Sequence, residues 1–195
     1  MRKIILASTS PRRKELLESV GLQFDVVHAK YEEDMSGHID PEKVVRMFSY
    51  EKAASLTSDY PDALIIAADT IVHINDTVYG KPSSLEEAKT MLASLSGKIH
   101  TVYTGYTVLD TKTDIYKTEV SKTEIKLAEL TSENIETYFK KVPPLDKAGA
   151  YAIQGLGSTF TEWIKGEYTN VVGLPLASLT KTLKEFGIDL LNNNR

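Results

Sequence analysis

The sequence predicts an α/β protein with a mixed sheet, because strand-like and helix-like segments alternate and two strands form an antiparallel pair. Residues 63–68, ALIIAA, are continuously apolar, which is typical of a central strand buried on both faces. Residues 99–109 and 115–128 alternate in polarity and are rich in Thr, Val, Ile and Tyr, which favours two long antiparallel strands around a turn. No repeat or linker divides the chain, so residues 1–195 are predicted to form one domain with two lobes.

The other elements are predicted from periodicity, caps and turn residues. Residues 3–7 form a short apolar run, Gly21 follows a helical pattern, and Pro41 can open a helix. Ser84 with Glu87 is a capping-box signature. The predicted short strands are residues 3–7, 24–28, 71–74 and 77–79, and the predicted helices are 11–20, 41–56, 84–95, 131–142 and 175–186. An acidic loop is predicted at 30–40, and a glycine-rich section with no assigned helix or strand follows the helix 131–142 up to Gly173.

The composition is that of an ordinary globular chain, with 42% hydrophobic and 26% charged residues and a net charge of −4. It contains no cysteine, which excludes thiolate catalysis and disulfides and suits a reducing compartment. The first apolar stretch is too short for a signal peptide, and no run approaches the about 18 apolar residues of a membrane span. We expect a cytoplasmic protein with no membrane or nucleic-acid partner, in which a local Lys and Arg cluster holds any anion.

A first cluster, Ser8-Thr9-Ser10-Pro11-Arg12-Arg13, follows one predicted strand and opens a helix. Ser10 and Pro11 are preferred N-cap and N1 residues, so unpaired N–H groups and the positive dipole end suit an anion there. Arg12 and Arg13 add donors suited to phosphate oxygens. Cations in the first turn oppose the dipole at a cost of about 0.3–1 kcal/mol each, so a negative group is expected nearby. A capped helix with solvated arginines is the alternative.

Asp69 and Thr70 follow the apolar run, where its strand is predicted to end. Ligands of open α/β sheets bind beyond the carboxyl ends of strands. An aspartate there is partly desolvated, which raises its pKa toward that of a useful general base, and it can also bind a hard cation. The alternative is an aspartate that caps the next turn.

Further charged residues suit the same chemistry. Lys52 lies on the second predicted helix, Lys81 lies in a Gly-Lys-Pro turn, and Glu32, Glu33 and Asp34 form an acidic run. Lysines bind phosphate as point charges, and carboxylates hold Mg²⁺ together with substrate oxygens. Taken singly, each of these residues is more often a solvated surface group.

The section 146–155, DKAGAYAIQG, is rich in small residues, which indicates a close approach of its backbone to another group. Gln154 offers a donor and an acceptor for a base edge, although a glutamine there is also an ordinary turn residue. The four histidines lack metal-ligand spacing and are interpreted as incidental, and no GxxxxGK[ST] phosphate loop is present. Trp163 is predicted to lie in the core.

Taken together, these motifs resemble the Maf family of nucleoside triphosphate pyrophosphatases, which is distantly similar in fold to the inosine-triphosphate pyrophosphatases. The resemblance covers nearly the whole chain, in order. It is carried by ILASTSPRRKELL at 5–17, EKA at 51–53, AADT at 67–70, GKP at 80–82, SGKIHTVYTGY at 96–106, DKAGAYAIQG at 146–155 and YTNVVGLPL at 168–176. It implies an elongated central sheet flanked by helices, with a cleft between two lobes, and a homodimer.

The resemblance also implies roles for individual residues. Asp69 matches the proposed proton acceptor that activates water. Ser8, Arg12, Arg13, Lys52 and Lys81 match residues that grip the triphosphate, and Glu33 and Asp69 match positions near a divalent metal, Mg²⁺ or Mn²⁺. Arg12, Thr70 and Gln154 match the set that marks the branch preferring dTTP and UTP over 7-methyl-GTP. Pro143 stands where the family often has Glu, which puts a metal or substrate contact from that position in doubt.

The residues and the resemblance lead to one hypothesis, metal-assisted hydrolysis of dTTP, UTP or a modified pyrimidine nucleotide to the monophosphate and pyrophosphate. Cationic groups and a divalent ion would offset the up to four negative charges of the triphosphate. The competing hypothesis is a regulator of septum formation that only binds a partner. Pyrophosphate release from a nucleotide panel distinguishes the two.

Overall fold

A computed structural model describes residues 2–34 and 40–192, so the predicted loop at 30–40 lies partly outside the described residues. The strands are β1 (Lys3–Ala7), β2 (Asp25–Val27), β3 (Ala63–Ile74), β4 (Thr77–Tyr79), β5 (Ile99–Asp110), β6 (Ile115–Leu127) and β7 (Thr161–Lys165). The helices are α1 (Pro11–Ser19), α2 (Pro41–Ala54), α3 (Leu85–Leu95), α4 (Ser132–Lys141), α5 (Tyr168–Val172) and α6 (Leu176–Glu185), with 3-10 turns η1 (Ala148–Ala150) and η2 (Gly155–Phe160). None of the helices in these ranges has the length and apolarity that a membrane crossing requires.

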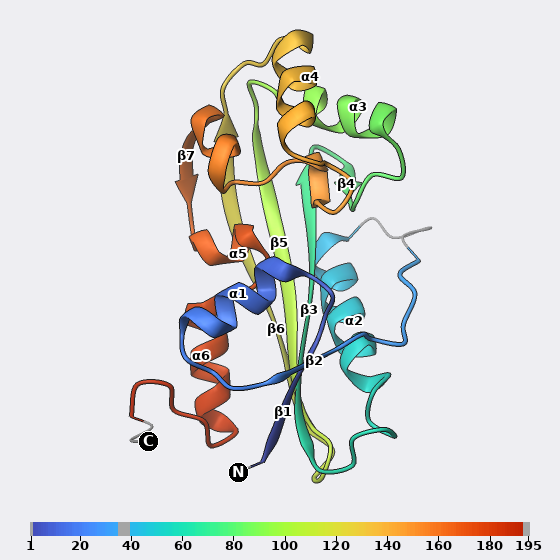
Figure 1. Cartoon of the computed structure of the whole chain (residues 1–195), viewed down its shortest axis with the longest axis vertical. Helices are drawn as coiled ribbons and strands as arrows, with labels where there is room; N and C mark the ends of the chain where they lie inside the picture. Colours follow the sequence, from blue (N-terminus) through green and yellow to red (C-terminus); the bar gives the residue numbers. More distant parts are fainter. Residues whose placement is uncertain (1, 35–39, 193–195) are drawn as a thin grey trace.

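The strands form one seven-stranded mixed sheet, which confirms the predicted fold class. Its order is β2-β1-β3-β5-β6-β7, and β4 pairs with β3 outside this path. β1 runs parallel to β2 and β3, whereas the β3–β5, β5–β6 and β6–β7 pairs are antiparallel. The three long strands β3, β5 and β6 run along the long axis of the molecule and give the sheet its elongated shape (Figure 1).

Helices cover both faces of the sheet at the end where the N-terminus lies (Figure 1). On one face, α1 and α6 bury Leu17 and Leu183 against Leu64 and Ile66 of β3. On the other face, α2 buries Ala53 against the neighbouring side chain Ile65. Successive side chains of β3 therefore point alternately into two apolar layers, as expected for a strand that is buried on both faces.

A separate apolar core lies at the opposite end of the sheet. There α3 and α4 pack with Tyr151 and Phe160 against the far ends of β3, β5 and β6. Leu92, Leu95, Ile135 and Tyr138 supply most of the helical surface of this core, and each is buried. The two ends of one sheet thus carry different cores, and these are the two lobes expected from the sequence.

Several local predictions were wrong. β3 does not end at residue 68 but continues through Asp69 to Ile74, because β5 pairs with it from Leu64 to His73. The glycine-rich section, for which no helix or strand was predicted, contains η2, β7 and α5. Trp163 is 39% exposed on the edge strand β7 rather than buried in the core.

Candidate active site

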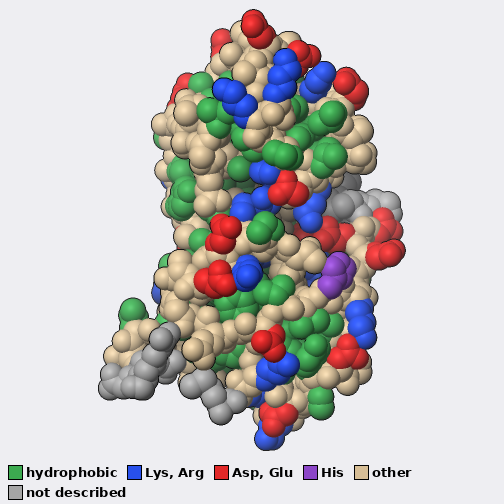
Figure 2. All heavy atoms as spheres, in the orientation of Figure 1, with side chains coloured by type: hydrophobic (Ala, Val, Ile, Leu, Met, Phe, Trp, Pro, Cys, Tyr) green, Lys and Arg blue, Asp and Glu red, His purple; other side chains and the backbone are tan. Residues whose placement is uncertain are grey.

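A pocket lies between the two ends of the sheet and collects charged side chains from segments far apart in the sequence. Figure 2 shows Lys, Arg, Asp and Glu side chains gathered midway along the long axis. The predicted site residues that line the pocket are Arg12, Arg13, Glu33, Lys52, Asp69, Thr70, Lys81 and Gln154. Ser8 is not among the lining residues, because it lies buried behind Arg13.

Because successive side chains of β3 point to opposite faces of the sheet, the neighbouring residues Asp69 and Thr70 have different partners. Asp69 follows Ile65 and Ala67 on the face that α2 covers, and Thr70 follows Ile66 and Ala68 on the face that α1 covers. β1 ends at Ala7, opposite Ala67, so both side chains project just beyond the parallel part of the sheet. The predicted position beyond the end of their own strand is therefore wrong, because β3 continues, but both residues lie just past the end of the neighbouring strand β1.

On the α2 face, one ammonium group joins two carboxylates. Lys52 Nζ lies 2.6 Å from Oδ1 of Asp69 and 2.5 Å from Oε1 of Glu33. The side chains of Lys52 and Asp69 are only 10% and 7% exposed, whereas that of Glu33 is 36% exposed. A single positive charge is thus shared by two carboxylates, so one negative charge of the trio remains in excess where little water is available to screen it.

The two carboxyl groups respond differently to this arrangement. Burial raises the pKa of Asp69, and the repulsion of Glu33 adds to this effect, while Lys52 and Arg13 oppose it. Desolvation also acts to raise the pKa of Glu33, but Lys52, Lys81 and Arg13 outweigh it and lower that pKa. The arrangement therefore favours the protonated form more at Asp69 than at Glu33.

On the α1 face, Arg13 is held by neutral oxygens. Its Nε donates to the carbonyl of Gly173 at 2.8 Å, its Nη2 to Oγ1 of Thr70 at 3.0 Å and its Nη1 to Oγ of Ser8 at 3.3 Å. A guanidinium has five N–H groups, so two remain for a ligand. No carboxylate is hydrogen-bonded to Arg13 among these contacts, so its charge is available to an anion in the pocket.

The start of α1 differs from the predicted cap. Ser10 occupies the N-cap position, but its side chain makes no capping hydrogen bond. Instead the N–H of Ser10 donates to Oγ of Ser8 at 3.2 Å. Ser8 therefore orders the turn between β1 and α1 and supports Arg13, and it does this from behind the pocket wall.

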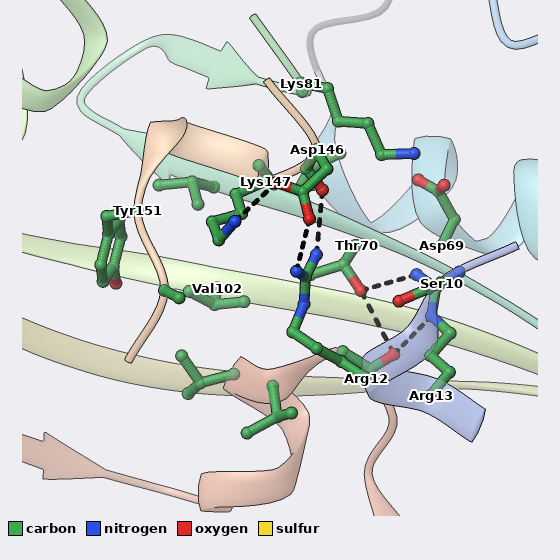
Figure 3. A pocket seen from close by; sticks show the side chains of 18 of the residues that line it. Ser10, Arg12, Arg13, Asp69, Thr70, Lys81, Val102, Asp146, Lys147 and Tyr151 are labelled. Carbon is green, nitrogen blue, oxygen red and sulfur yellow. Dashed lines mark hydrogen bonds and ion pairs between the residues drawn. The ribbon is translucent and has the colours of Figure 1, made fainter. Parts of the chain in front are cut away.

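Arg12 meets the negative group that its place in the first turn led us to expect. Its Nη1 donates to Oδ2 of Asp146 at 2.7 Å, and its Nη2 donates to the backbone carbonyl of the same residue at 2.9 Å (Figure 3). Lys81, in the turn after β4, extends into the pocket from the other side (Figure 3). Gln154, just before η2, is exposed and lines the pocket.

Sequence reasoning quoted Asp146 and Lys147 within a motif but gave them no role. Both line the pocket, and Lys147 Nζ donates to the carbonyl of Pro143, the position at which an acidic contact was in doubt. The small residues after them fit a close approach, because a Cβ on Gly149 would lie 2.9 Å from Cγ2 of Val72 and this glycine has a φ of +66°. The signal in the sequence was a pair of opposite charges, Asp146 and Lys147, at the start of a run of small residues that contains Gly149.

The fold and the pocket define a class, an elongated mixed α/β protein that can hold a polyanion beside a buried carboxylate. The chain belongs to the Maf-like protein family, whose model matches residues 3–186. It is 46% identical to a dTTP/UTP pyrophosphatase of Bacillus cereus strain B4264, and the match spans 97% of this chain and 98% of that protein. A dTTP/UTP pyrophosphatase of Bacillus anthracis is 45% identical over the same shares.

Solved structures resemble the chain more distantly. The Staphylococcus aureus Ham1 protein has a TM-score of 0.47 at 11% identity, covering 66% of this chain and 73% of that one. A HAM1 protein from Coxiella burnetii has a TM-score of 0.47 at 14% identity, covering 67% and 75%. Likenesses this partial carry no argument about the site.

Proposed function

We propose that this chain hydrolyses dTTP and UTP to the nucleoside monophosphate and pyrophosphate. The observation that carries the proposal is the convergence of Arg12, Arg13, Lys52 and Lys81, from three separate segments, around the buried carboxylate of Asp69. Its membership of the Maf-like family and its similarity to proteins named dTTP/UTP pyrophosphatase over almost their whole length support the same activity.

The chemistry assigned to Asp69 is that of a general base. It accepts a proton from water while the water oxygen bonds to the α phosphorus and the bond from that phosphorus to the α–β bridging oxygen breaks. Pyrophosphate then leaves. Arg13 and Lys81 stabilise charge on the departing phosphates, because preorganised cations in a water-poor pocket act more strongly than they do in solution.

The residues present fit a divalent cation, Mg²⁺ or Mn²⁺. The carboxylates of Glu33 and Asp69 lie close enough together to contact one cationic group at the same time, because both are within hydrogen-bond distance of Lys52 Nζ. Mg²⁺ is usually held by one or two carboxylates together with substrate phosphates. When bound, such an ion supplies Lewis-acid polarisation of the phosphates. Within the described residues, no cluster of three or more His, Cys, Asp or Glu provides a complete protein cage.

Base selectivity is proposed to depend on Thr70, Arg12 and Gln154. Thr70 and Arg12 are both engaged with other protein groups, whereas the exposed amide of Gln154 is free to offer a donor and an acceptor to a pyrimidine edge. The cytoplasmic location and the homodimer stay predictions.

The base assignment is tested with Asp69→Asn, which keeps the shape of the side chain but accepts protons poorly. We expect the rate of pyrophosphate release from dTTP and UTP, measured with Mg²⁺ or Mn²⁺, to fall by about 10²–10⁴-fold. Asp25→Asn, on β2 and away from the pocket, is the matched control and should retain full activity. Thermal unfolding checks that both variants fold, and wild-type turnover by Asp69→Asn would exclude this base.

A further inference from the structure

The carboxylate of Asp146 lies between two cations at the pocket. Arg12 binds one carboxylate oxygen and the backbone carbonyl, and Lys147 Nζ lies 2.5 Å from the other carboxylate oxygen, Oδ1. Lys147 is fixed further by its hydrogen bond of 2.7 Å to the carbonyl of Pro143. The contact joins α1 to the loop after α4, so it links the two lobes across the pocket (Figure 3).

The same donors suit a phosphate. A guanidinium and an ammonium that each hold one carboxylate oxygen can hold two oxygens of a phosphate in the same way, with short charge-assisted hydrogen bonds. Arg13 differs, because its hydrogen bonds to Gly173, Ser8 and Thr70 all go to neutral oxygens. Of the two neighbouring arginines, only Arg12 is therefore neutralised by a direct carboxylate contact.

The three side chains differ in their access to water. Asp146 is 51% exposed, whereas Arg12 is 21% and Lys147 only 10% exposed. If the contact opens, the carboxylate can hydrate at once, but the two cations cannot hydrate equally well and need another anion. Exchange of Asp146 for a ligand phosphate therefore costs little, provided that the ligand carries enough charge.

We propose, on the basis of the polyphosphate-binding function above, that Asp146 is a resident anion that occupies a phosphate position and is displaced from Arg12 and Lys147 by the substrate. Each incoming phosphate competes with this carboxylate. A triphosphate, with its higher charge, competes well, whereas a monophosphate competes poorly and leaves as the contact closes again. Asp146 is thus a positioning residue that sets the affinity of the pocket for phosphates.

The test is the affinity of Asp146→Asn for inorganic phosphate and for pyrophosphate, measured by isothermal titration calorimetry at fixed ionic strength. The amide keeps the size of the side chain but removes the competing charge, so we expect about fivefold tighter binding of both anions. Glu136→Gln is the matched control. It also removes one carboxylate from an ion pair, with Lys89 on the surface, and should leave both affinities within about twofold of wild type.

The outcomes separate the explanations. Tighter binding is not expected from a merely damaged site, and the gain should shrink in an Arg12→Gln background, where the displaced contact is already broken. Unchanged or weaker binding of phosphate and pyrophosphate by Asp146→Asn overturns the inference. If that variant aggregates, the same two affinities are measured with Asp146→Ser. If the wild type binds neither anion, the proposed function fails as well, whereas binding by the wild type with no gain in the variant refutes the role of Asp146 alone.

Discussion

At the scale of single residues, Lys52 is the most heavily constrained group of the pocket. It forms ion pairs with both Glu33 and Asp69, and its own side chain is almost fully buried. Removing one partner of a buried ion pair leaves the other charge uncompensated, which costs far more than an exposed pair contributes. Lys52 therefore supports the fold as well as the proposed chemistry.

Lys52→Met should lower the free energy of unfolding at pH 7 by about 3 kcal/mol. Without the ammonium, the pKa of Asp69 in the folded state, which burial already raises, rises further above its value in the unfolded chain. The folded variant then binds protons more readily, so its deficit should shrink as the pH falls toward about 5. Urea unfolding at the two pH values measures this change.

Lys89→Met, which breaks only exposed ion pairs with Glu86 and Glu136, is the control and should stay within about 0.5 kcal/mol of wild type at both pH values. Adding Mg²⁺ should raise the stability of Lys52→Met more than that of the wild type, because without the ammonium the two carboxylates attract the ion more strongly. A deficit that responds to neither pH nor Mg²⁺ would contradict the shared-charge account.

At the scale of elements, local sequence predicted the segments well but not where long-range pairing extends them. The run ALIIAA was interpreted as a doubly buried strand, and its two faces do feed two cores. That β3 continues past Asp69 depends on β5, a partner whose pairing no local pattern encodes. β7 was missed because it is a short edge strand with mostly exposed side chains, and the contact of Arg12 with Asp146 joins segments that only the fold brings together.

The packing of α2 on the sheet places Lys52, and it depends on one glycine. A Cβ on Gly105 of β5 would lie 2.2 Å from the carbonyl oxygen of Val45 and 2.9 Å from the backbone nitrogen of Arg46. These are backbone atoms of the helix, so no side-chain rotation can relieve the overlap. The absence of a side chain here lets the helix backbone lie directly on the strand.

Gly105→Ala should therefore displace α2 and destabilise the protein by about 1–3 kcal/mol or more, the usual cost of overpacking. Chemical denaturation measures the loss. Gly80→Ala is the matched substitution, because nothing lies within 4 Å of a Cβ there, and it should change stability little. Equal stability of the two variants would show that the backbone of α2 does not pack directly against Gly105.

At the scale of the whole molecule, one sheet connects the two lobes. β3, β5 and β6 pass through both ends without interruption, whereas domains that move as rigid bodies are usually joined by flexible linkers with few contacts. The lobes are therefore not expected to close by a hinge. Ligand contacts must instead form through side chains and loops that face each other across a preformed pocket.

Pyrophosphate should consequently slow amide hydrogen exchange on both sides of the pocket at once, in the first turn of α1 and in residues 146–154. At about 100 times its Kd, a ligand stabilises the bound form by about 2.7 kcal/mol, so amides that exchange only from the free form should slow by up to about a hundredfold. The exposed amides of residues 112–114, in the turn between β5 and β6, can exchange without release of the ligand and serve as the internal reference. Sulfate at matched ionic strength controls for charge alone. If α1 were protected but residues 146–154 were not, the anion would be held by one lobe only. That result would contradict a pocket in which both lobes contact the polyphosphate.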